Sequence, residues 1–321
     1  MNTATKLGAF GLGLVVVFGG AFGAGRVVGP GTPAEPGHNT STGGHSGGHD
    51  EQTKSDTTAN GGLTPGGLLV SDRGYTFTPV TGADGEFAFR IIGPDGQPVT
   101  AFDVEHEKRM HLIVARRDLS GFRHVHPDLA ADGTWRVTSP LGEPGSWRAF
   151  ADFKPTGGEA LTLGVDVAVP GVFAPRALPA TSATATVDDY TVTLDGVLTP
   201  GRTSKLTLNV NRGGAPVTDL QPYLGAYGHL VALRDGDLAY LHVHPDGEPG
   251  DGKTQPGPSV TFYAEVPSTG TYRLFLDFQH GGVVRTAEFT LTAGPTGTPA
   301  SPTETATTPA PTPASSGHSH N

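Results

Sequence analysis

Residues 111–128 read HLIVARRDLSGFRHVHPD, and residues 229–246 read HLVALRDGDLAYLHVHPD. Extended backwards, Val99–Asp128 aligns without a gap on Val217–Asp246 at an offset of 118, with ten of thirty positions identical. The match resumes after a seven-residue insertion, where GSWRAFADF at 145–153 corresponds to GTYRLFLDF at 270–278. A repeat at a fixed offset indicates a tandem duplication and sets the number of domains at two.

Both copies show strand-like alternation of apolar and polar residues, interrupted every 8–12 residues by Gly, Pro, Asp or Asn. This rhythm is typical of antiparallel β-sandwiches. The expected fold class is therefore all-β, with two tandem Ig-like antiparallel β-sandwich domains. Clear examples of the expected strands are Glu86–Ile92, Leu206–Val210, Val260–Val266 and Ala287–Leu291.

Composition divides the chain into six expected segments. They are a signal anchor or transmembrane segment (1–28), a disordered His/Gly-rich linker (29–67), the first sandwich (68–171), a linker (172–186), the second sandwich (187–293) and a disordered Thr/Pro/His tail (294–321). The two disordered segments have neither a helical nor a strand period and are rich in Gly, Pro, Ser and Thr.

The N-terminal segment 7–25 consists of 19 uncharged residues between Lys6 and Arg26. Its length favours a single membrane span with extracytoplasmic domains, although its glycines weaken the span. A cleaved signal peptide ending at Ala21-Phe22-Gly23 is the alternative, in which case the protein is secreted. A buried N-terminal helix is a third reading. In the first two, the domains lie outside the cytoplasm.

The charge and cysteine counts exclude several classes of protein. The formal net charge is −10 and no basic run occurs, so nucleic acid is not an expected partner. Without cysteine there are no disulfide frameworks, thiol nucleophiles, Fe–S clusters or Cys-type zinc sites.

The repeated segment places three histidines at matched spacings in each copy. If each hairpin has a four-residue loop, Arg116 pairs with Gly121, and His111 then lies opposite His126. Side chains alternate along a strand, so His124 shares the face of His126. Imidazoles at such cross-strand positions can converge on one metal ion. The expected ligand trios are His111, His124 and His126 in the first copy and His229, His242 and His244 in the second.

Two aspartates on a later strand, Asp152 and Asp277, belong to the candidate metal sites. Each is a fourth ligand, an acceptor that fixes an imidazole tautomer, or a partner of Arg148 or Arg273. His106 and His280 have no counterpart in the other copy and are accessory candidates. Five further histidines fall in the two tails, where short His tracts bind late transition metals weakly: His38, His45, His49, His318 and His320.

The donor set indicates the metal. With no cysteine, and with Met1 and Met110 as the only methionines, a thioether Cu(I) site is not expected. Imidazole with an optional carboxylate suits Cu(II), Zn(II) or Ni(II), and the affinity order favours Cu(II), with Zn(II) next.

The HLxVxRRDx5HVHP segment resembles a group of actinobacterial membrane-anchored exported β-proteins, similar to the YtkA-like and CopC-like extracytoplasmic domains. The resemblance covers the anchor and both β-domains. It implies an Ig-like sandwich and a metal-handling role carried by the six repeated histidines. The chain departs from copper-resistance domains in having neither a mature N-terminal histidine nor Met-rich loops.

The function expected from these features is extracytoplasmic binding of Cu(II) or Zn(II), to buffer the ion or deliver it to an envelope transporter or chaperone. Catalysis is not expected, because the downstream cupin Glu and the Gly-x-Ser-x-Gly, His-Glu-x-x-His and P-loop patterns are missing. The alternative function is a non-catalytic adhesion or interaction module at the cell surface.

Overall fold

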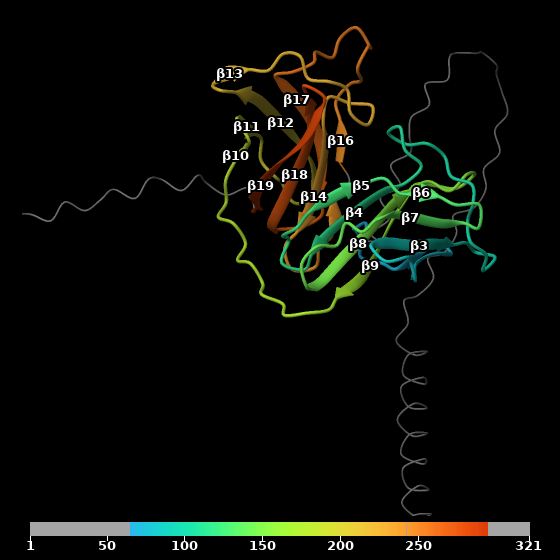
Figure 1. The fold of residues 1–321 in the computed structure, drawn as a ribbon. Helices are drawn as coiled ribbons and strands as arrows, with labels where there is room; N and C mark the ends of the chain where they lie inside the picture. The colour runs from blue at the N-terminus through green and yellow to red at the C-terminus, as the bar shows by residue number, and fades with distance from the viewer. Residues whose placement is uncertain (1–64, 242, 295–321) are drawn as a thin grey trace, which may run out of the picture. The chain divides into compact units, whose positions relative to one another are not determined.

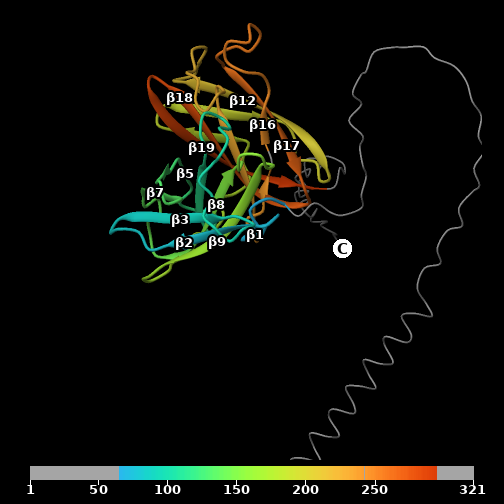
Figure 2. The same ribbon diagram turned by 90° about the vertical axis from the view of Figure 1, so that its right-hand side faces the viewer.

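The computed structural model describes residues 65–241 and 243–294, and all its regular structure is β. These residues form four antiparallel sheets in two repeated domains, which Figures 1 and 2 show from two sides. The prediction of two tandem all-β sandwich domains is confirmed. Residues 1–64, residue 242 and residues 295–321 lie outside the described part, and with them the expected anchor, the His-bearing tails and His242.

The first domain contains nine strands in two sheets, in the orders β1-β2-β3-β7-β6 and β5-β4-β8-β9. The second contains ten, with sheets β10-β11-β12-β17-β16 and β15-β14-β18-β19 and with β13 paired to β12. The order of β2, β3, β7 and β6 against β4, β8 and β9 is the ABED and CFG arrangement of Ig-type sandwiches, and the second domain repeats it. The fold assignment rests on this strand order.

The strands of the first domain are β1 (Ser71–Asp72), β2 (Tyr75–Val80), β3 (Glu86–Ile92), β4 (His111–Arg116), β5 (Arg123–Val125), β6 (Asp128–Leu129), β7 (Thr134–Thr138), β8 (Gly145–Phe153) and β9 (Leu161–Val169). Those of the second are β10 (Thr184–Val187), β11 (Tyr190–Asp195), β12 (Arg202–Arg212), β13 (Ala215–Pro216), β14 (His229–Arg234), β15 (Tyr240–Leu241), β16 (Val243–Pro245), β17 (Ser259–Val266), β18 (Gly270–His280) and β19 (Val283–Ala293). The expected strand Glu86–Ile92 is β3, and the other three expected strands lie within β12, β17 and β19.

A third apolar cluster joins the two domains, in addition to one core inside each sandwich. It forms where the β4–β8 sheet of the first domain meets the β14–β18 sheet of the second. The rings of Phe122 and Phe275 stack there with centroids 4.0 Å apart and an interplanar angle of 4°. Equivalent positions of the two copies contribute, such as Ile113 with Val231. Both sheets are therefore buried on both faces, and the interface is part of the folded structure rather than a loose contact.

The linker between the domains follows the first domain closely. The backbone N–H of Arg176 donates to Asp118 at 2.8 Å, and Asp118 is in turn held by Arg116 at 2.7 Å. Leu178 packs against the apolar cluster between the domains. These contacts fix the path of the linker and help to hold the two sandwiches together.

Candidate metal centre at the domain interface

The first-domain hairpin has the register that the sequence predicts. Leu112 pairs with Val125 and Ile113 pairs with His124, which continues to place His111 opposite His126. His111 begins β4 and is 4 % exposed, while the side chain of His124 is 1 % exposed. The alternation of the strands thus directs three imidazoles of the first domain to one face of the sheet, as expected.

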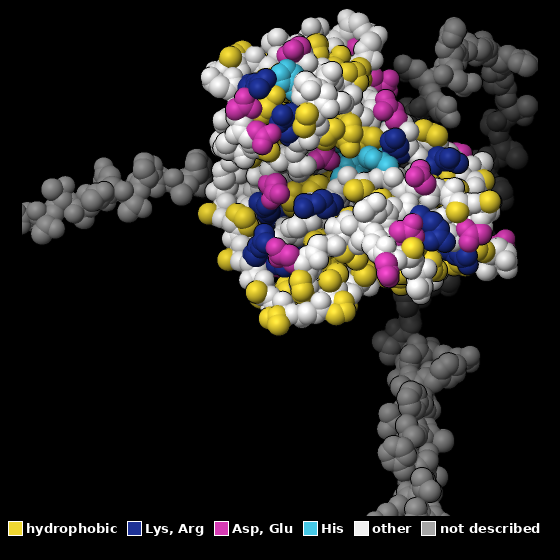
Figure 3. All heavy atoms as spheres, in the orientation of Figure 1, with side chains coloured by type: hydrophobic (Ala, Val, Ile, Leu, Met, Phe, Trp, Pro, Cys, Tyr) yellow, Lys and Arg dark blue, Asp and Glu magenta, His cyan; other side chains and the backbone are white. Residues whose placement is uncertain are grey.

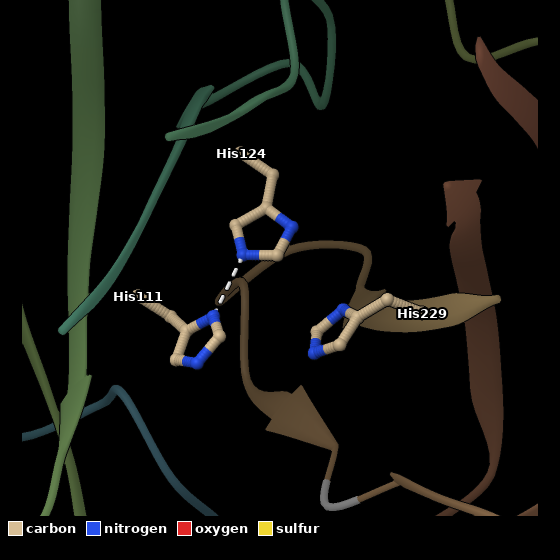
Figure 4. Close-up of side chains that lie close together, drawn as sticks. All are labelled: His111, His124 and His229. Atoms are coloured by element: carbon tan, nitrogen blue, oxygen red, sulfur yellow. Dashed lines mark hydrogen bonds between the residues drawn. The ribbon is translucent and has the colours of Figure 1, made fainter. Parts of the chain in front are cut away.

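That face is the one covered by the second domain, and it receives a further histidine there. His229, which begins β14 and is the counterpart of His111, stacks on His111 with ring centroids 5.6 Å apart and an angle of 7°. One nitrogen of each of His111, His124 and His229 lies within 4.8 Å of the other two (Figure 4). The histidines that meet in the described part of the chain therefore come from both domains, instead of forming one trio in each.

The hydrogen bonds of His111 and His124 determine which nitrogens face the centre. Nε2 of His111 lies 3.1 Å from the carbonyl oxygen of Glu105, and Nδ1 of His124 lies 2.9 Å from Oδ2 of Asp277. A carbonyl and a carboxylate only accept, so each of these nitrogens carries the N–H. Nδ1 of His111 and Nε2 of His124 face each other at 3.1 Å, a contact that Figure 4 marks as a hydrogen bond and that requires an N–H on one of them. Without that additional proton, both nitrogens present lone pairs, and a metal cation between them would bind both.

Two further ring nitrogens in the cluster are buried and have no hydrogen-bond partner, Nδ1 of His229 and Nε2 of His126. The ring of His126 lies 5.0 Å from that of His111 and 4.8 Å from that of His124. Buried polar atoms are normally hydrogen-bonded, and an orphaned one points to a missing partner such as an ion. Both nitrogens are available as ligands.

Burial favours the neutral form of three histidines of the cluster, His111, His126 and His229. It lowers the pKa of His111 to about 4, and the neighbouring His124 lowers it further. Burial, followed by the charges of His124 and His111, lowers the pKa of His126 to about 3. The same causes place the pKa of His229 well below its ordinary value. Unprotonated imidazole is the form that coordinates metal ions, so these groups are ready to bind without losing a proton.

The two candidate aspartates occupy equivalent places, opposite the first histidine of each β4-type strand. Asp152 pairs with His111 across β4 and β8, and Asp277 pairs with His229 across β14 and β18. Asp277 is 3 % exposed and also accepts a 2.6 Å hydrogen bond from Thr286. The Asp277 carboxylate accepts the Nδ1–H of His124 from the other domain, and this hydrogen bond fixes the tautomer of His124. Asp152 accepts from Thr162 at 3.2 Å.

The arginines beside these aspartates have other carboxylate partners. Arg148 pairs with Asp166 at 3.0 Å and also donates to the carbonyl of Gly67. Arg273 pairs with Glu288. These carboxylates, Asp166 and Glu288, lie on the neighbouring strands β9 and β19.

The remaining candidate histidines lie in three different settings. His244 belongs to β16, which pairs with β17 of the opposite sheet, whereas its expected partner His229 lies in β14. His106 joins the cluster from a neighbouring turn, with its ring 6.1 Å from His111 and 6.0 Å from His229. His280 is elsewhere, between Tyr190 and Asp219 at 2.6 and 3.0 Å. His242 lies outside the described residues.

A family model matches the chain twice, at residues 71–171 and 185–294, and together these matches cover more than half of it. The model is described as a domain of unknown function (DUF8832). The chain belongs to this family. The two matches correspond to the two sandwiches, and no curated protein matches the chain. The resemblance to YtkA-like and CopC-like domains gains no support from these comparisons.

Several solved structures show a remote likeness. A protein of Corynebacterium diphtheriae described as membrane-anchored is 11 % identical, with a TM-score of 0.19 over 70 % of this chain and 60 % of that one. MtrC from Shewanella baltica OS185 is 8 % identical, with a TM-score of 0.20 over 68 % of each chain. The FN1–FN3 domains of chicken CNTN1 are 12 % identical, with a TM-score of 0.17 over 71 % of this chain and 65 % of theirs. This chain spans less than two thirds of the first of these proteins, and scores this low carry no argument.

None of the described residues forms a helix with the length and apolar character that crossing a membrane requires. The candidate span at 7–25 lies outside the part of the chain to which this finding applies.

Proposed function

We propose that this protein binds a divalent late transition-metal ion as cargo at the interface between its domains, Cu(II) first and Zn(II) next. Its role would be to buffer the ion or deliver it in the cell envelope, without turnover. The observation that carries the proposal is the 3.1 Å approach of the ring nitrogens of His111 and His124, with a ring nitrogen of His229 within 4.8 Å of both and its Nδ1 without a hydrogen-bond partner. Three imidazoles that share one buried space form a donor set suited to these ions.

The spacing of the nitrogens fits an ion of this size. Two nitrogens bound to one ion at roughly 2.0–2.1 Å lie about 3–3.4 Å apart at right-angle or tetrahedral geometry. The His111 and His124 nitrogens are 3.1 Å apart, and the third nitrogen is within 4.8 Å, so a small movement of His229 would complete the set. The hydrogen bonds that the first two rings donate to Glu105 and Asp277 hold them in the orientation that this geometry requires.

The place of action follows from the sequence rather than from the described residues. The uncharged stretch 7–25 supports export and anchoring, and the spacer that follows would hold the sandwiches away from the membrane. An envelope transporter or metal chaperone is the class of partner that such a protein would serve.

The test is a metal titration of the full chain in which the five tail histidines are replaced by serine, so that weak tail binding does not contribute. Calorimetry with Cu(II) and Zn(II) should give one ion per chain. His124→Ala in the first domain and His229→Ala in the second should each lower the affinity by roughly 100-fold or more, because each removes a ligand. His280→Gln is the matched control and should leave it unchanged, because His280 is bonded to Tyr190 and Asp219 instead.

Binding that survives His229→Ala would contradict a shared site. A chain that takes up no stoichiometric ion would exclude metal handling and favour the adhesion module.

A further inference from the structure

The turn Glu105–Lys108 carries the exposed member of the histidine cluster. Two backbone hydrogen bonds of 2.9 and 3.0 Å close it, between Glu105 and Lys108. The two central residues, His106 and Glu107, have φ values of 47° and 65°, as in a tight type I′ turn. His106 is exposed, whereas His111 is buried, the side chain of His124 is 1 % exposed, and His126 and His229 are partly buried. In Figure 3, histidine side chains reach the surface near the centre of the view, beside basic side chains.

The turn is fixed to the cluster from two sides. Its first residue, Glu105, accepts the N–H of His111 through its carbonyl oxygen. The Glu105 carboxylate pairs with Lys154 at 3.2 Å, and Lys154 also contacts Asp103 at 3.6 Å. The His106 ring is thereby held against both His111 and His229, with centroids 6.1 and 6.0 Å away. The His106 ring therefore lies between solvent and the imidazoles of His111 and His229, which belong to different domains.

The second domain builds the same turn without a histidine. Tyr223 and Ala226 close it with the same pair of backbone bonds, at 2.7 and 3.3 Å. Leu224 and Gly225 have φ values of 56° and 77° in the places of His106 and Glu107, and Leu224 is 2 % exposed. The turn therefore does not depend on an imidazole at this position. The first domain places an exposed one there, next to the buried trio.

We propose that His106 is the exchange ligand of the interface site, the group through which a divalent ion enters and leaves. This inference rests on the proposed function. An ion arriving from solvent or from a donor exchanges one of its outside ligands for the His106 imidazole. His111 and His229 then each replace a further outside ligand, and His124 replaces His106 in the last step. Each bond that forms replaces one that breaks, so the ion keeps its charge and its coordination number, and no redox step is involved.

The experiment measures rates and affinity separately. Stopped-flow absorbance follows Cu(II) loading of the full chain with tail histidines replaced by serine, and Cu(II) removal by EDTA. His106→Leu installs the residue that the second domain has in this turn. It should slow both loading and release at least tenfold, while their ratio, which sets the affinity, changes less than threefold. Glu107→Gly, which copies Gly225, keeps the imidazole and should leave both rates unchanged.

Three results would overturn the inference. Unchanged rates in His106→Leu would show that His106 takes no part in exchange. An affinity lowered more than tenfold with faster release would make His106 a resident ligand of the bound ion. A matching loss of rate in Glu107→Gly would assign the effect to the turn itself. His106→Asn, which suits a left-handed backbone, replaces the leucine variant if that one does not fold. If the parent chain binds no ion, the proposed function fails and not this inference alone.

Discussion

The two hairpins share the sequence HVHPD at equivalent positions but take it to different sheets. In the first domain β5 stays on β4 through Val125, and pairing with β7 of the opposite sheet begins at Asp128. In the second domain the described pairing with β14 includes Leu241, and pairing with β17 begins at Val243. Val243 is the counterpart of Val125, so pairing with the opposite sheet begins three residues earlier in the second domain.

The residue before the shared segment differs in a way that accounts for the shift. Leu241 is 1 % exposed and lies in the core of the second domain, whereas its counterpart Arg123 is exposed. Burial of Leu241 favours a path of the chain into its own sandwich, where β16, with His244, pairs with β17. In the first domain His126 remains beside the trio. Identical histidine motifs thus occupy different positions in the two sandwiches, next to an apolar residue in one copy and a charged residue in the other.

The largest expected effect comes from the apolar surface where the two copies meet. Phe275 belongs to the cluster between the domains and Phe278 to the core of the second domain, and both are fully buried. Phe275→Ala and Phe278→Ala should each lower the free energy of unfolding by about 3–5 kcal/mol. Only Phe275→Ala should also weaken Cu(II) binding under native conditions, because it loosens the contact that positions His229. Denaturant unfolding and calorimetry check the two effects, and equal losses of affinity would contradict an interface site.

The next effect is on the pH dependence of stability in the metal-free chain. An unfolded histidine titrates near pH 6.5, whereas the pKa of His111 is about 4 and that of His126 about 3 in the folded chain. Below pH 6.5 the unfolded chain binds more protons, so stability that is complete above pH 6.5 is lost as the pH falls towards 4. The loss attributable to His111 is on the order of 3 kcal/mol. His111→Asn should flatten this slope in urea unfolding from pH 7 to 4, and an unchanged slope would show that His111 is not buried as an uncharged group.

The smallest effect compares the last histidines of the two hairpins. His126→Ala should weaken Cu(II) binding by roughly tenfold, the lower end of the range for groups that support a metal site without dominating it. His244→Ala should leave the affinity unchanged, because β16 belongs to the other sheet. Equal losses in calorimetric titrations would mean that the two hairpins function alike despite their different crossing points.

Much of the fold can be predicted from the sequence because it depends on local pattern. The offset of 118 identifies the duplication, and the alternation in segments such as Glu86–Ile92 identifies strands. The hairpin count from Arg116 and Gly121 gives the observed register of β4 and β5. These features are set by neighbours in the sequence and by the period of a strand.

The composition of the site cannot be predicted in the same way, because it depends on which faces of the two domains meet. A signal for this contact does exist. Leu112–Ala115 and Leu230–Leu233 are continuous apolar runs, and such runs indicate strands that are covered on both faces. These runs indicate that the outer face of each sheet is buried. They do not indicate that the other domain is what covers that face. The placement of His229 beside His111 and His124 needs the tertiary contact of Phe122 with Phe275.

The most direct measurement is a crystal structure of the chain loaded with Cu(II), with anomalous scattering recorded on both sides of the copper edge. The expected result is one anomalous peak per chain, between Nδ1 of His111, Nε2 of His124 and the ring of His229. A separate peak inside each sandwich, or no peak among these three histidines, would contradict a site shared between the two domains.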